Sequence, residues 1–254
     1  MNCKAFLINL ADHGERRHRS VKLIENIGVD YEVIPAVDGR VKNDRVEELV
    51  KRSNSKEIIG RQIGTREIAC ALSHLKCYHS LITSPLNWAL VLEDDIQLRE
   101  MTPSEFNQTF TQILEHVHTT EPTVILLGHH LTYERTEDGK PRLFSRKSCV
   151  LRDRNMGPFS ERPSGGYAYL INRTAAEQRI LEMEKIDYPI DYWLPKNYRL
   201  TGLFPPLVDF DSNIESEIQQ DRQPSLEVNT LNATVKKILL RSRSYLYQLT
   251  RSYD

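Results

Sequence analysis

Three consecutive acidic residues, Glu93, Asp94 and Asp95, follow an apolar run that begins at Trp88. The run is typical of a buried strand, and ligands bind at the carboxyl ends of strands in open α/β sheets. Adjacent carboxylates repel one another, so a divalent cation would stabilise the cluster. Oxygen ligands suit Mn²⁺ or Mg²⁺, which would bridge a diphosphate. The alternative interpretation is an acidic turn that faces water.

Two arginines, Arg16 and Arg17, come shortly after the first apolar segment, residues 4–10. Arginine can hold a diphosphate or a uracil edge through paired hydrogen bonds. Cations near a helix N-terminus oppose the helix macrodipole, which indicates an anion close by. A solvated helix start is equally consistent with the pair.

His74 lies in a helix predicted to begin at Gly64 and Thr65, with Thr65 as its N-cap. Glu67 and His74 are seven residues apart and therefore share a helix face. Ser73 lies about 100° around the axis from His74. A single histidine on a helix is usually structural, but this helix directly precedes the acidic strand, which raises a ligand-side role for His74 as the alternative.

Asp191 lies within the run Pro189–Trp193, among apolar and aromatic residues. An acid enclosed in this way is not a typical surface charge. It is either a hydrogen-bonded structural carboxylate or a general base with a tuned pKa. His129 and His130 follow another apolar strand but have no partner at a metal-ligand spacing.

The order of the predicted elements indicates an α/β protein. Strand, helix and strand patterns occupy residues 4–10, 15–27 and 31–36, as at the start of a nucleotide-binding sheet. No G-x-G-x-x-G follows the first strand, so a dinucleotide Rossmann site is disfavoured. Further predictions are a short helix with a surface loop at 43–63, helices at 103–118 and 174–183, strands at 124–128 and 167–171, and a long polar excursion at 132–163.

Composition narrows the class of protein. The 254 residues suffice for one large or two small domains. A net charge of -1 gives no global field for nucleic acid. The four cysteines show neither zinc-like pairing nor a disulfide framework, so a reducing cytosol is the default. With no secretory leader pattern and no apolar run near the roughly 20 residues that span a bilayer, we expect a cytoplasmic protein.

The segment 235–251 is basic and contains no acid. Wound as a helix, it places apolar residues on one side and lysine and arginine on the remainder. This pattern fits an interfacial helix drawn to anionic lipid on the inner face of the plasma membrane. A helix packed on the domain with a solvated basic face is equally consistent. We therefore divide the chain into a catalytic domain, residues 1–232, and a basic amphipathic tail, residues 233–254.

Together these pieces resemble glycosyltransferase family 25, in its bacterial lipooligosaccharide galactosyltransferase type. The resemblance runs in order from residue 4 to about residue 218, and its most specific part is the helix followed by the acidic strand end. A late histidine metal ligand is missing, because no histidine follows His130. Glycine directly before Glu67 and a Gly-Thr-His run at Gly166 are also absent. The matching segments are Phe6–Leu10 with Arg16 and Arg17, Ala36–Gly39, Gly64–His74, Leu92–Asp95, Gly166–Ile171 and Pro189–Trp193.

The resemblance implies a GT-A-like fold, a UDP-sugar donor (UDP-galactose in this family), Mn²⁺ or Mg²⁺, and inversion at the anomeric carbon. The acceptor would be a sugar of lipooligosaccharide or lipopolysaccharide. A carboxylate would deprotonate the acceptor hydroxyl, and the cation would neutralise the departing UDP. The implied roles are metal ligation by Asp95 with Glu93 or Asp94; nucleotide contact by Asn9, Arg16, Arg17 and Asp38; sugar contact by Glu67, Ser73 and His74; and base catalysis by Asp191, with Asp153 as second candidate.

Two other functions are consistent with parts of the sequence. The missing late histidine favours a non-catalytic relative that binds nucleotide sugar or glycan in a regulatory role. The intact acidic triplet counts against it. A nucleotidyltransferase would need a glycine-rich phosphate loop after the first strand, and Ala11-Asp12-His13-Gly14 is not one.

Overall fold

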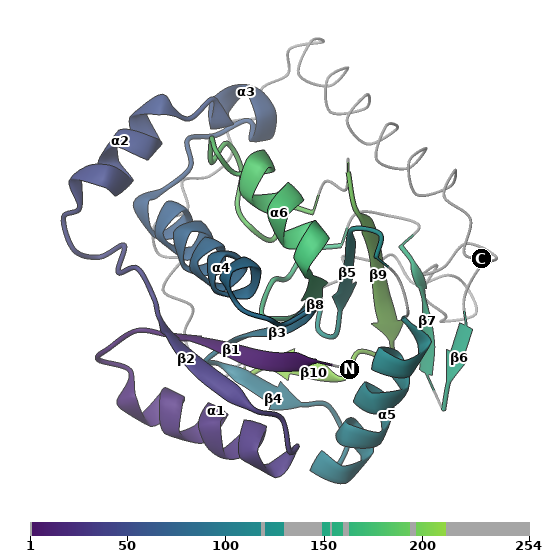
Figure 1. The fold of residues 1–254 in the computed structure, drawn as a ribbon. Coiled ribbons are helices and arrows are strands. Elements are labelled where there is room, and N and C mark those ends of the chain that lie inside the picture. Colours follow the sequence, from purple (N-terminus) through teal and green to yellow (C-terminus); the bar gives the residue numbers. More distant parts are fainter. Residues whose placement is uncertain are drawn as a thin grey trace, which may run out of the picture.

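The computed structural model describes residues 2–117, 120–129, 149–152, 154–159, 163–193 and 197–211. In this part of the chain, an eight-stranded sheet in the order β2-β1-β3-β8-β5-β9-β7-β6 forms the centre of a mixed α/β fold, with helices on both faces (Figure 1). The sheet strands are β1 (Cys3–Asn9), β2 (Tyr31–Pro35), β3 (Trp88–Glu93), β5 (Thr123–Leu126), β6 (Cys149–Leu151), β7 (Arg154–Pro158), β8 (Ala168–Asn172) and β9 (Arg199–Phe204). The helices are α1 (Gly14–Asn26), α2 (Asp44–Arg52), α3 (Ser55–Ile59), α4 (Thr65–Thr83), α5 (Pro103–His116) and α6 (Arg173–Glu182).

The N-terminal part of the sheet is parallel, as the strand-helix-strand pattern predicted. β1 pairs in parallel with β2 on one side and with β3 on the other. The connection from β1 to β2 runs through α1, and the connection from β2 to β3 runs through α4. Successive strands therefore lie on opposite sides of β1, which creates a topological switch point at the carboxyl ends of β1 and β3.

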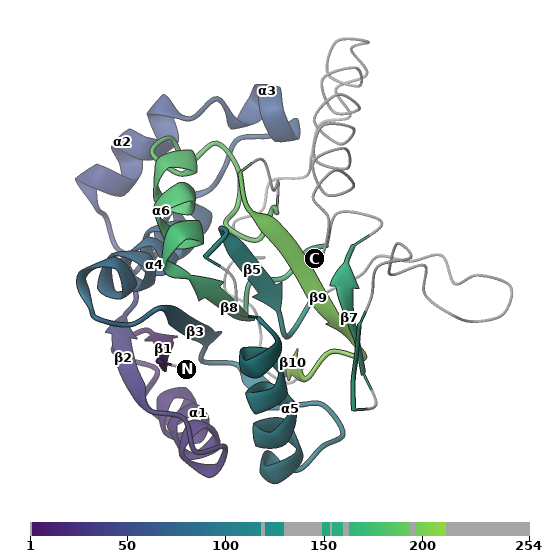
Figure 2. The ribbon, with the colours of Figure 1, turned by 45° about the vertical axis from the view of Figure 1, so that its right-hand side comes forward.

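Two apolar layers cover the two faces of the sheet. In β1, Phe6 and Ile8 belong to the layer under α4 and α6, whereas Ala5 and Leu7 belong to the layer over α1 and α5. This alternation follows from the two-residue repeat of a strand. The turned view shows α1 and α5 on one side of the sheet, with α4 and α6 on the other (Figure 2). Because α1 and α4 lie on opposite faces of the sheet, the switch point lies between the N-terminal turns of these two helices.

Beyond β3 the sheet changes direction. β8 pairs antiparallel with both β3 and β5, and β9 continues the sheet parallel to β5. After the acidic residues the chain turns into β4 (Ile96–Leu98), which pairs antiparallel with β10 (Val208–Phe210) in a separate two-stranded sheet. Asp211 donates its backbone N–H to the Asp95 carbonyl at 2.7 Å. This hydrogen bond therefore ties the end of the two-stranded sheet to the acidic turn.

The predicted start of α4 is wrong by one residue. Gly64 is the N-cap, and Thr65 is the first helical residue. The Thr65 hydroxyl instead donates to the Gly39 carbonyl at 3.1 Å, and the Glu67 carboxylate accepts the Gly64 N–H at 3.1 Å. The N–H of the N-cap glycine is therefore satisfied by a side chain at the third helical position, and glycine itself has no capping side chain by which the helix start could be recognised.

Two other predictions about the elements need correction. Residues 43–63 contain two helices, α2 and α3, separated by Ser53 and Asn54. The expected polar excursion at 132–163 contains strands β6 and β7 in its described part. These two short strands contain proline, glycine and charged residues, and β6 forms the edge of the sheet, so neither shows the apolar alternation that predicts a strand.

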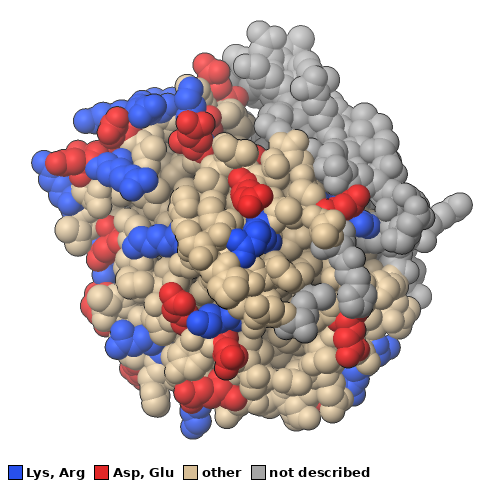
Figure 3. Space-filling view, in the orientation of Figure 1, with Lys and Arg blue, Asp and Glu red and all other residues tan. Residues whose placement is uncertain are grey.

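On the face shown in Figure 3, basic and acidic side chains are interspersed over the described surface, without a broad area of one sign. This distribution agrees with the balanced composition. Among the helices that the structure describes, none has the length and apolar character needed to cross a membrane.

Candidate functional site

A pocket opens at the switch point, between the starts of α1 and α4. β1 contributes Asn9, the loop after β2 contributes Asp38, α4 contributes His74, and the end of β3 contributes the acids. Residues far apart in the sequence therefore meet because β1 and β3 are adjacent parallel strands. The lining residues are Ile8, Asn9, Leu10, His13, Arg16, Ala36, Val37, Asp38, Gly39, Arg40, Arg66, Cys70, Ser73, His74, Glu93, Asp94 and Asp95.

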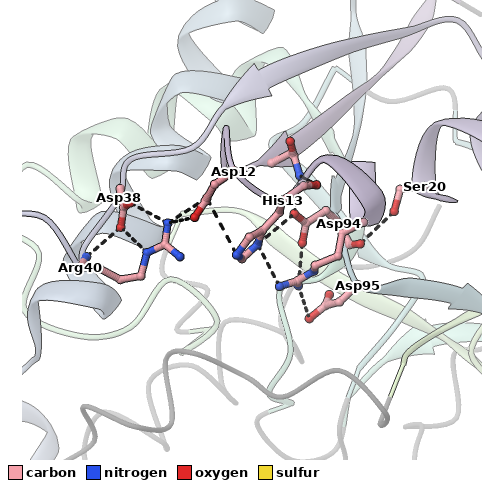
Figure 4. A network of polar contacts seen from close by, with 9 residues as sticks. Asp12, His13, Ser20, Asp38, Arg40, Asp94 and Asp95 are labelled. Atoms are coloured by element: carbon pink, nitrogen blue, oxygen red, sulfur yellow. Dashed lines mark hydrogen bonds and ion pairs between the residues drawn. The ribbon is translucent and has the colours of Figure 1, made fainter. Parts of the chain in front are cut away.

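Arg16 on α1 faces the acidic turn. Its guanidinium lies 2.7 Å from an Asp94 carboxylate oxygen and 3.4 Å from one of Asp95. Asn9 donates its side-chain N–H to Asp94 at 2.6 Å, and Ser20 donates its hydroxyl to the Asp94 carbonyl at 3.0 Å. Figure 4 shows these contacts converging on the acidic turn. The structure thus brings together four residues predicted to act in one site, Asn9, Arg16, Asp94 and Asp95.

The acidic turn carries more negative charge than Arg16 neutralises. Burial, together with the Glu93 and Asp94 carboxylates and against the opposing effect of Arg16, raises the pKa of Asp95 to about 7. Burial also raises the pKa of Asp94, against the effects of Arg16 and Asn9. One Asp95 carboxylate oxygen is buried without a hydrogen-bond partner among the described residues. An unsatisfied carboxylate oxygen beside two other acids is a suitable ligand for a hard divalent cation.

A second charged group lies at the opposite end of the pocket. Arg40 donates to Asp38 at 2.7 Å and to Asp12 at 2.8 Å, and these hydrogen bonds lower the pKa of both carboxyl groups. Gly39 makes this arrangement possible, because a Cβ there would lie 2.6 Å from the Arg66 Cα. Asp38 is therefore ionised and fixed against the start of α4 (Figure 4).

The helix residues predicted to border a sugar take up different environments. Ser73 accepts the Val37 N–H at 2.8 Å and donates to the Ala69 carbonyl at 2.8 Å, so it ties the loop after β2 to α4. His74 is fully buried, and its Nδ1 lies 2.7 Å from the Tyr169 hydroxyl. Its Nε2 lies 3.4 Å from Glu93 Oε1. Glu93 therefore faces α4, whereas Asp94 and Asp95 face α1.

Two predicted donor contacts lie outside the pocket lining. Glu67 is buried and forms a paired salt bridge with Arg61, with both N–O distances at 2.6 Å. This salt bridge fixes the segment before α4 to the start of the helix, so Glu67 has a structural role. Arg17 is exposed on α1, one position beyond the arginine that reaches the acids. Contact of Glu67 or Arg17 with a donor remains a prediction.

Asp191 lies close to the α4 side of the pocket without lining it. A Cβ placed on Gly166 would lie 3.4 Å from the Asp191 Cβ and 3.9 Å from His74 Cε1. Gly166 therefore keeps open the space between Asp191 and His74. The Trp193 ring N–H donates to the Gly165 carbonyl at 2.8 Å, which holds the Asp191 segment beside this glycine. The second candidate base, Asp153, lies outside the described residues, as does the basic segment 235–251.

Four pocket residues with polar, charged or thiol side chains had no assigned role in the sequence interpretation: His13, Arg40, Arg66 and Cys70. His13 had a detectable signal, since it lies in the polar loop directly after β1. Cys70 had one too, because it precedes His74 by four residues on the same helix face. Arg40 and Arg66 come together only through the close approach at Gly39, which no spacing rule shows.

The model of glycosyltransferase family 25 (LPS biosynthesis protein) matches residues 2–194. The chain belongs to this family. It is 26% identical over 204 residues to procollagen galactosyltransferase 1 of Danio rerio, covering 77% of this chain and 31% of that protein. It is 24% identical over 236 residues to a putative glycosyltransferase of Haemophilus influenzae, covering 85% of this chain and 76% of that protein.

A third relative is the probable inactive glycosyltransferase 25 family member 3 of Bos taurus. It is 28% identical over 122 residues, which are 45% of this chain and 19% of that protein. The chain thus spans less than a third of the length of these two animal relatives. The family assignment supports a role in glycosyl transfer and confirms the resemblance seen in the sequence.

Proposed function

We propose that the protein is a metal-dependent, inverting glycosyltransferase that uses a UDP-hexose donor. Family membership favours UDP-galactose and a β-linked product, and we propose a lipooligosaccharide or lipopolysaccharide sugar as the acceptor, reached from the cytoplasmic face of the membrane. The observation that carries the proposal is the acidic turn at the switch point, where Glu93, Asp94 and Asp95 follow one another and one guanidinium, that of Arg16, contacts Asp94 and Asp95. A divalent cation would balance the excess negative charge and could at the same time bind the anionic diphosphate of a donor.

Asp95 and Glu93 are the proposed ligands of Mn²⁺ or Mg²⁺. The partnerless Asp95 oxygen fits this role, since a buried acceptor is costly unless a ligand satisfies it. When bound, the cation would supply Lewis-acid neutralisation of the leaving diphosphate. Asn9 and Arg16 hold Asp94 in place, so the acidic turn keeps its shape before the donor arrives. Arg16 also offers N–H donors to a phosphate at the same position.

The remaining pocket residues fit the two ends of a sugar nucleotide. Asp38, held ionised by Arg40, presents carboxylate oxygens that can accept hydrogen bonds from ribose hydroxyls or the uracil N–H. Ser73 and His74 border the space for the sugar near Glu93. The nucleotide would therefore lie toward Asp38, and the anomeric carbon toward α4.

Asp191 is the proposed general base. It lies across Gly166 from His74, and we propose that the acceptor hydroxyl approaches the sugar from this side. The carboxylate would take the hydroxyl proton as the oxygen attacks the anomeric carbon, and the bond to UDP would break on the opposite face. This single displacement inverts the anomeric configuration.

A non-catalytic relative that binds a nucleotide sugar is the second candidate. The observation in its favour is the similarity to a family member named as probable inactive. It would retain donor binding and lack transfer, so binding alone does not separate the two functions.

Thermal unfolding with and without Mn²⁺ against UDP-, GDP- and CMP-sugars tests the donor assignment. We expect UDP-galactose with metal to raise Tm selectively, because a ligand of the native state stabilises by mass action. Asp95→Ala should abolish both this shift and transfer while keeping its circular dichroism. Near-wild-type turnover in Asp95→Ala would contradict the metal assignment. A UDP-sugar shift without transfer to any acceptor would favour the binding relative.

A further inference from the structure

Cys70, His74 and Glu93 bring one sulfur, one nitrogen and one oxygen together on the α4 side of the pocket. Their ligand atoms lie within 4.8 Å of one another, and all three residues line the pocket. We propose that they bind a thiophilic divalent cation such as Zn²⁺. This site goes beyond the proposed transfer reaction, in which the carboxylates of the acidic turn hold a hard cation.

The helix and the strand preorganise the three ligands. Cys70 and His74 are four residues apart on α4, so their side chains project from one face. Glu93 ends β3 and lies with its Oε1 3.4 Å from His74 Nε2. Tetrahedral Zn²⁺ separates nitrogen, oxygen and sulfur ligands by about 3.3–3.8 Å. Separations up to 4.8 Å need to close by at most about 1.5 Å, which side-chain rotation of Cys70 or Glu93 provides.

The imidazole of His74 has the environment of a metal ligand. Its Nε2 is buried without a hydrogen-bond partner among the described residues. Its Nδ1 contacts the Tyr169 hydroxyl at 2.7 Å, and Tyr169 contacts the Tyr78 hydroxyl at 2.7 Å. Ligating histidines commonly use their second nitrogen in such an orienting hydrogen bond. With Nδ1 donating to Tyr169, the Nε2 lone pair is available to a cation.

The charges around Cys70 also favour a cation. Burial raises the pKa of the Cys70 thiol, and the carboxylates of Glu93, Asp191, Asp95 and Glu67 raise it too, so this half-buried residue lies in a negative potential that a cation would offset. On binding, the Sγ–H bond would break, its proton would pass to solvent, and a sulfur–metal bond would form. Three protein ligands leave a fourth position toward the pocket for water. Sulfur and imidazole ligands select Zn²⁺ over Mg²⁺ and Mn²⁺. The two proposed cation sites therefore share Glu93 and differ in their other ligands, which are Cys70 and His74 in one and Asp95 in the other.

Cobalt(II) is the probe, because a thiolate bound to Co²⁺ gives a ligand-to-metal charge-transfer band in the near ultraviolet. We expect the full-length protein to develop this band on addition of Co²⁺, with a final intensity that corresponds to one thiolate ligand per Co²⁺. Added Zn²⁺ should displace Co²⁺ and abolish the band. Calorimetric titration with Zn²⁺ gives the affinity. Neither measurement contains a sugar nucleotide, so the result is independent of the transfer proposal.

Three variants make the assignment specific. Cys70→Ser should lose the band and weaken Zn²⁺ binding at least tenfold, whereas Cys149→Ser, on strand β6 at the opposite edge of the sheet from β2, should retain both. Glu93→Gln keeps the thiol and should weaken Zn²⁺ binding tenfold, which provides a second test if Cys70→Ser misfolds. Absence of a charge-transfer band in the wild type, or an unchanged band in folded Cys70→Ser, would overturn the proposal.

Discussion

At the scale of single residues, the carboxylates of the acidic turn destabilise the native state by mutual repulsion, and the same repulsion favours binding of a cation. Asp95 is half-buried beside two like charges, with one carboxylate oxygen fully buried, so its ionised form destabilises the native state in the absence of a cation. Arg16 compensates part of this cost through contacts to Asp94 and Asp95. A site of this kind is expected where charge is reserved for a ligand, because residues tuned for function are commonly unfavourable for stability.

The raised pKa of Asp95 predicts a specific dependence of stability on pH. The native carboxyl titrates near pH 7 and the unfolded one near its ordinary value of 3.8. The native state therefore binds more protons between these values, and the free energy of unfolding falls as pH rises through this window. Asp95→Asn should remove this slope and stabilise the metal-free protein above pH 7 by on the order of 2–4 kcal/mol.

Urea unfolding of the metal-free proteins at a series of pH values, in chelator, measures this difference. Comparing wild type with Asp95→Asn cancels the contributions of other titrating groups. Parallel pH profiles for the two proteins would show that Asp95 titrates at its ordinary pKa in the native state.

Asp191 is expected to affect chemistry and not donor binding. Asp191→Asn should lower kcat by roughly two to four decades while the donor Kd stays within about twofold, as expected for loss of a general base. Glu177→Gln, a change of carboxylate to amide on helix α6, is a control with no role in the pocket. An unchanged rate in Asp191→Asn would assign the base elsewhere, with Asp153 as the next residue to replace.

At the scale of elements, the pocket depends on how closely the loop after β2 approaches α4. Gly39 allows this approach, and the Ser73 hydroxyl bridges the same loop to the helix. The Arg61–Glu67 salt bridge fixes the segment that leads into the helix. Asp38 and Arg40 thus owe their positions to contacts with the first turns of α4.

Gly39→Ala tests this dependence. The added Cβ would meet the backbone of Arg66 at 2.6 Å, so the loop must move, at a cost of about 1–3 kcal/mol. Donor affinity should fall with it, because Asp38 moves. Gly14→Ala is the matched control, since its Cβ would have nothing within 4 Å, and its stability should stay within about 0.5 kcal/mol of wild type. Chemical denaturation and donor titration of both variants measure the two effects, and equal behaviour would contradict the close-approach argument.

These elements show which parts of the fold could be predicted from sequence patterns and which could not. The parallel start of the sheet and the helices α1, α4, α5 and α6 followed from apolar periodicity, because each packs one face on the core. The pocket acids followed from their place at the end of a strand. Strands β6 and β7, the Gly64 cap and the Arg40–Asp38 pair were not predictable, since each depends on contacts that leave no periodic pattern in the sequence.

At the scale of the whole molecule, the basic segment 235–251 raises the question of where the protein works. If it is an interfacial helix, it adds electrostatic attraction to anionic lipid on top of apolar burial. Deleting residues 235–254 should then abolish sedimentation with phosphatidylserine vesicles while leaving the melting temperature and donor binding unchanged. Salt should weaken binding of the full-length chain. Equal vesicle binding by the truncated and full-length proteins would assign the segment to a solvated face instead.

The pocket is lined by residues from the first part of the chain, and this has a consequence for how members of the family can diverge. The residues that line it lie between Ile8 and Asp95, whereas the proposed base and the antiparallel strands follow later. Under the proposed function, donor recognition and acceptor chemistry are thus encoded in successive stretches of sequence joined through the β3–β8 pairing. Selection can then reshape the later stretch for new acceptors while the earlier one keeps the same activated sugar, so a single inherited donor half can serve proteins that glycosylate very different targets.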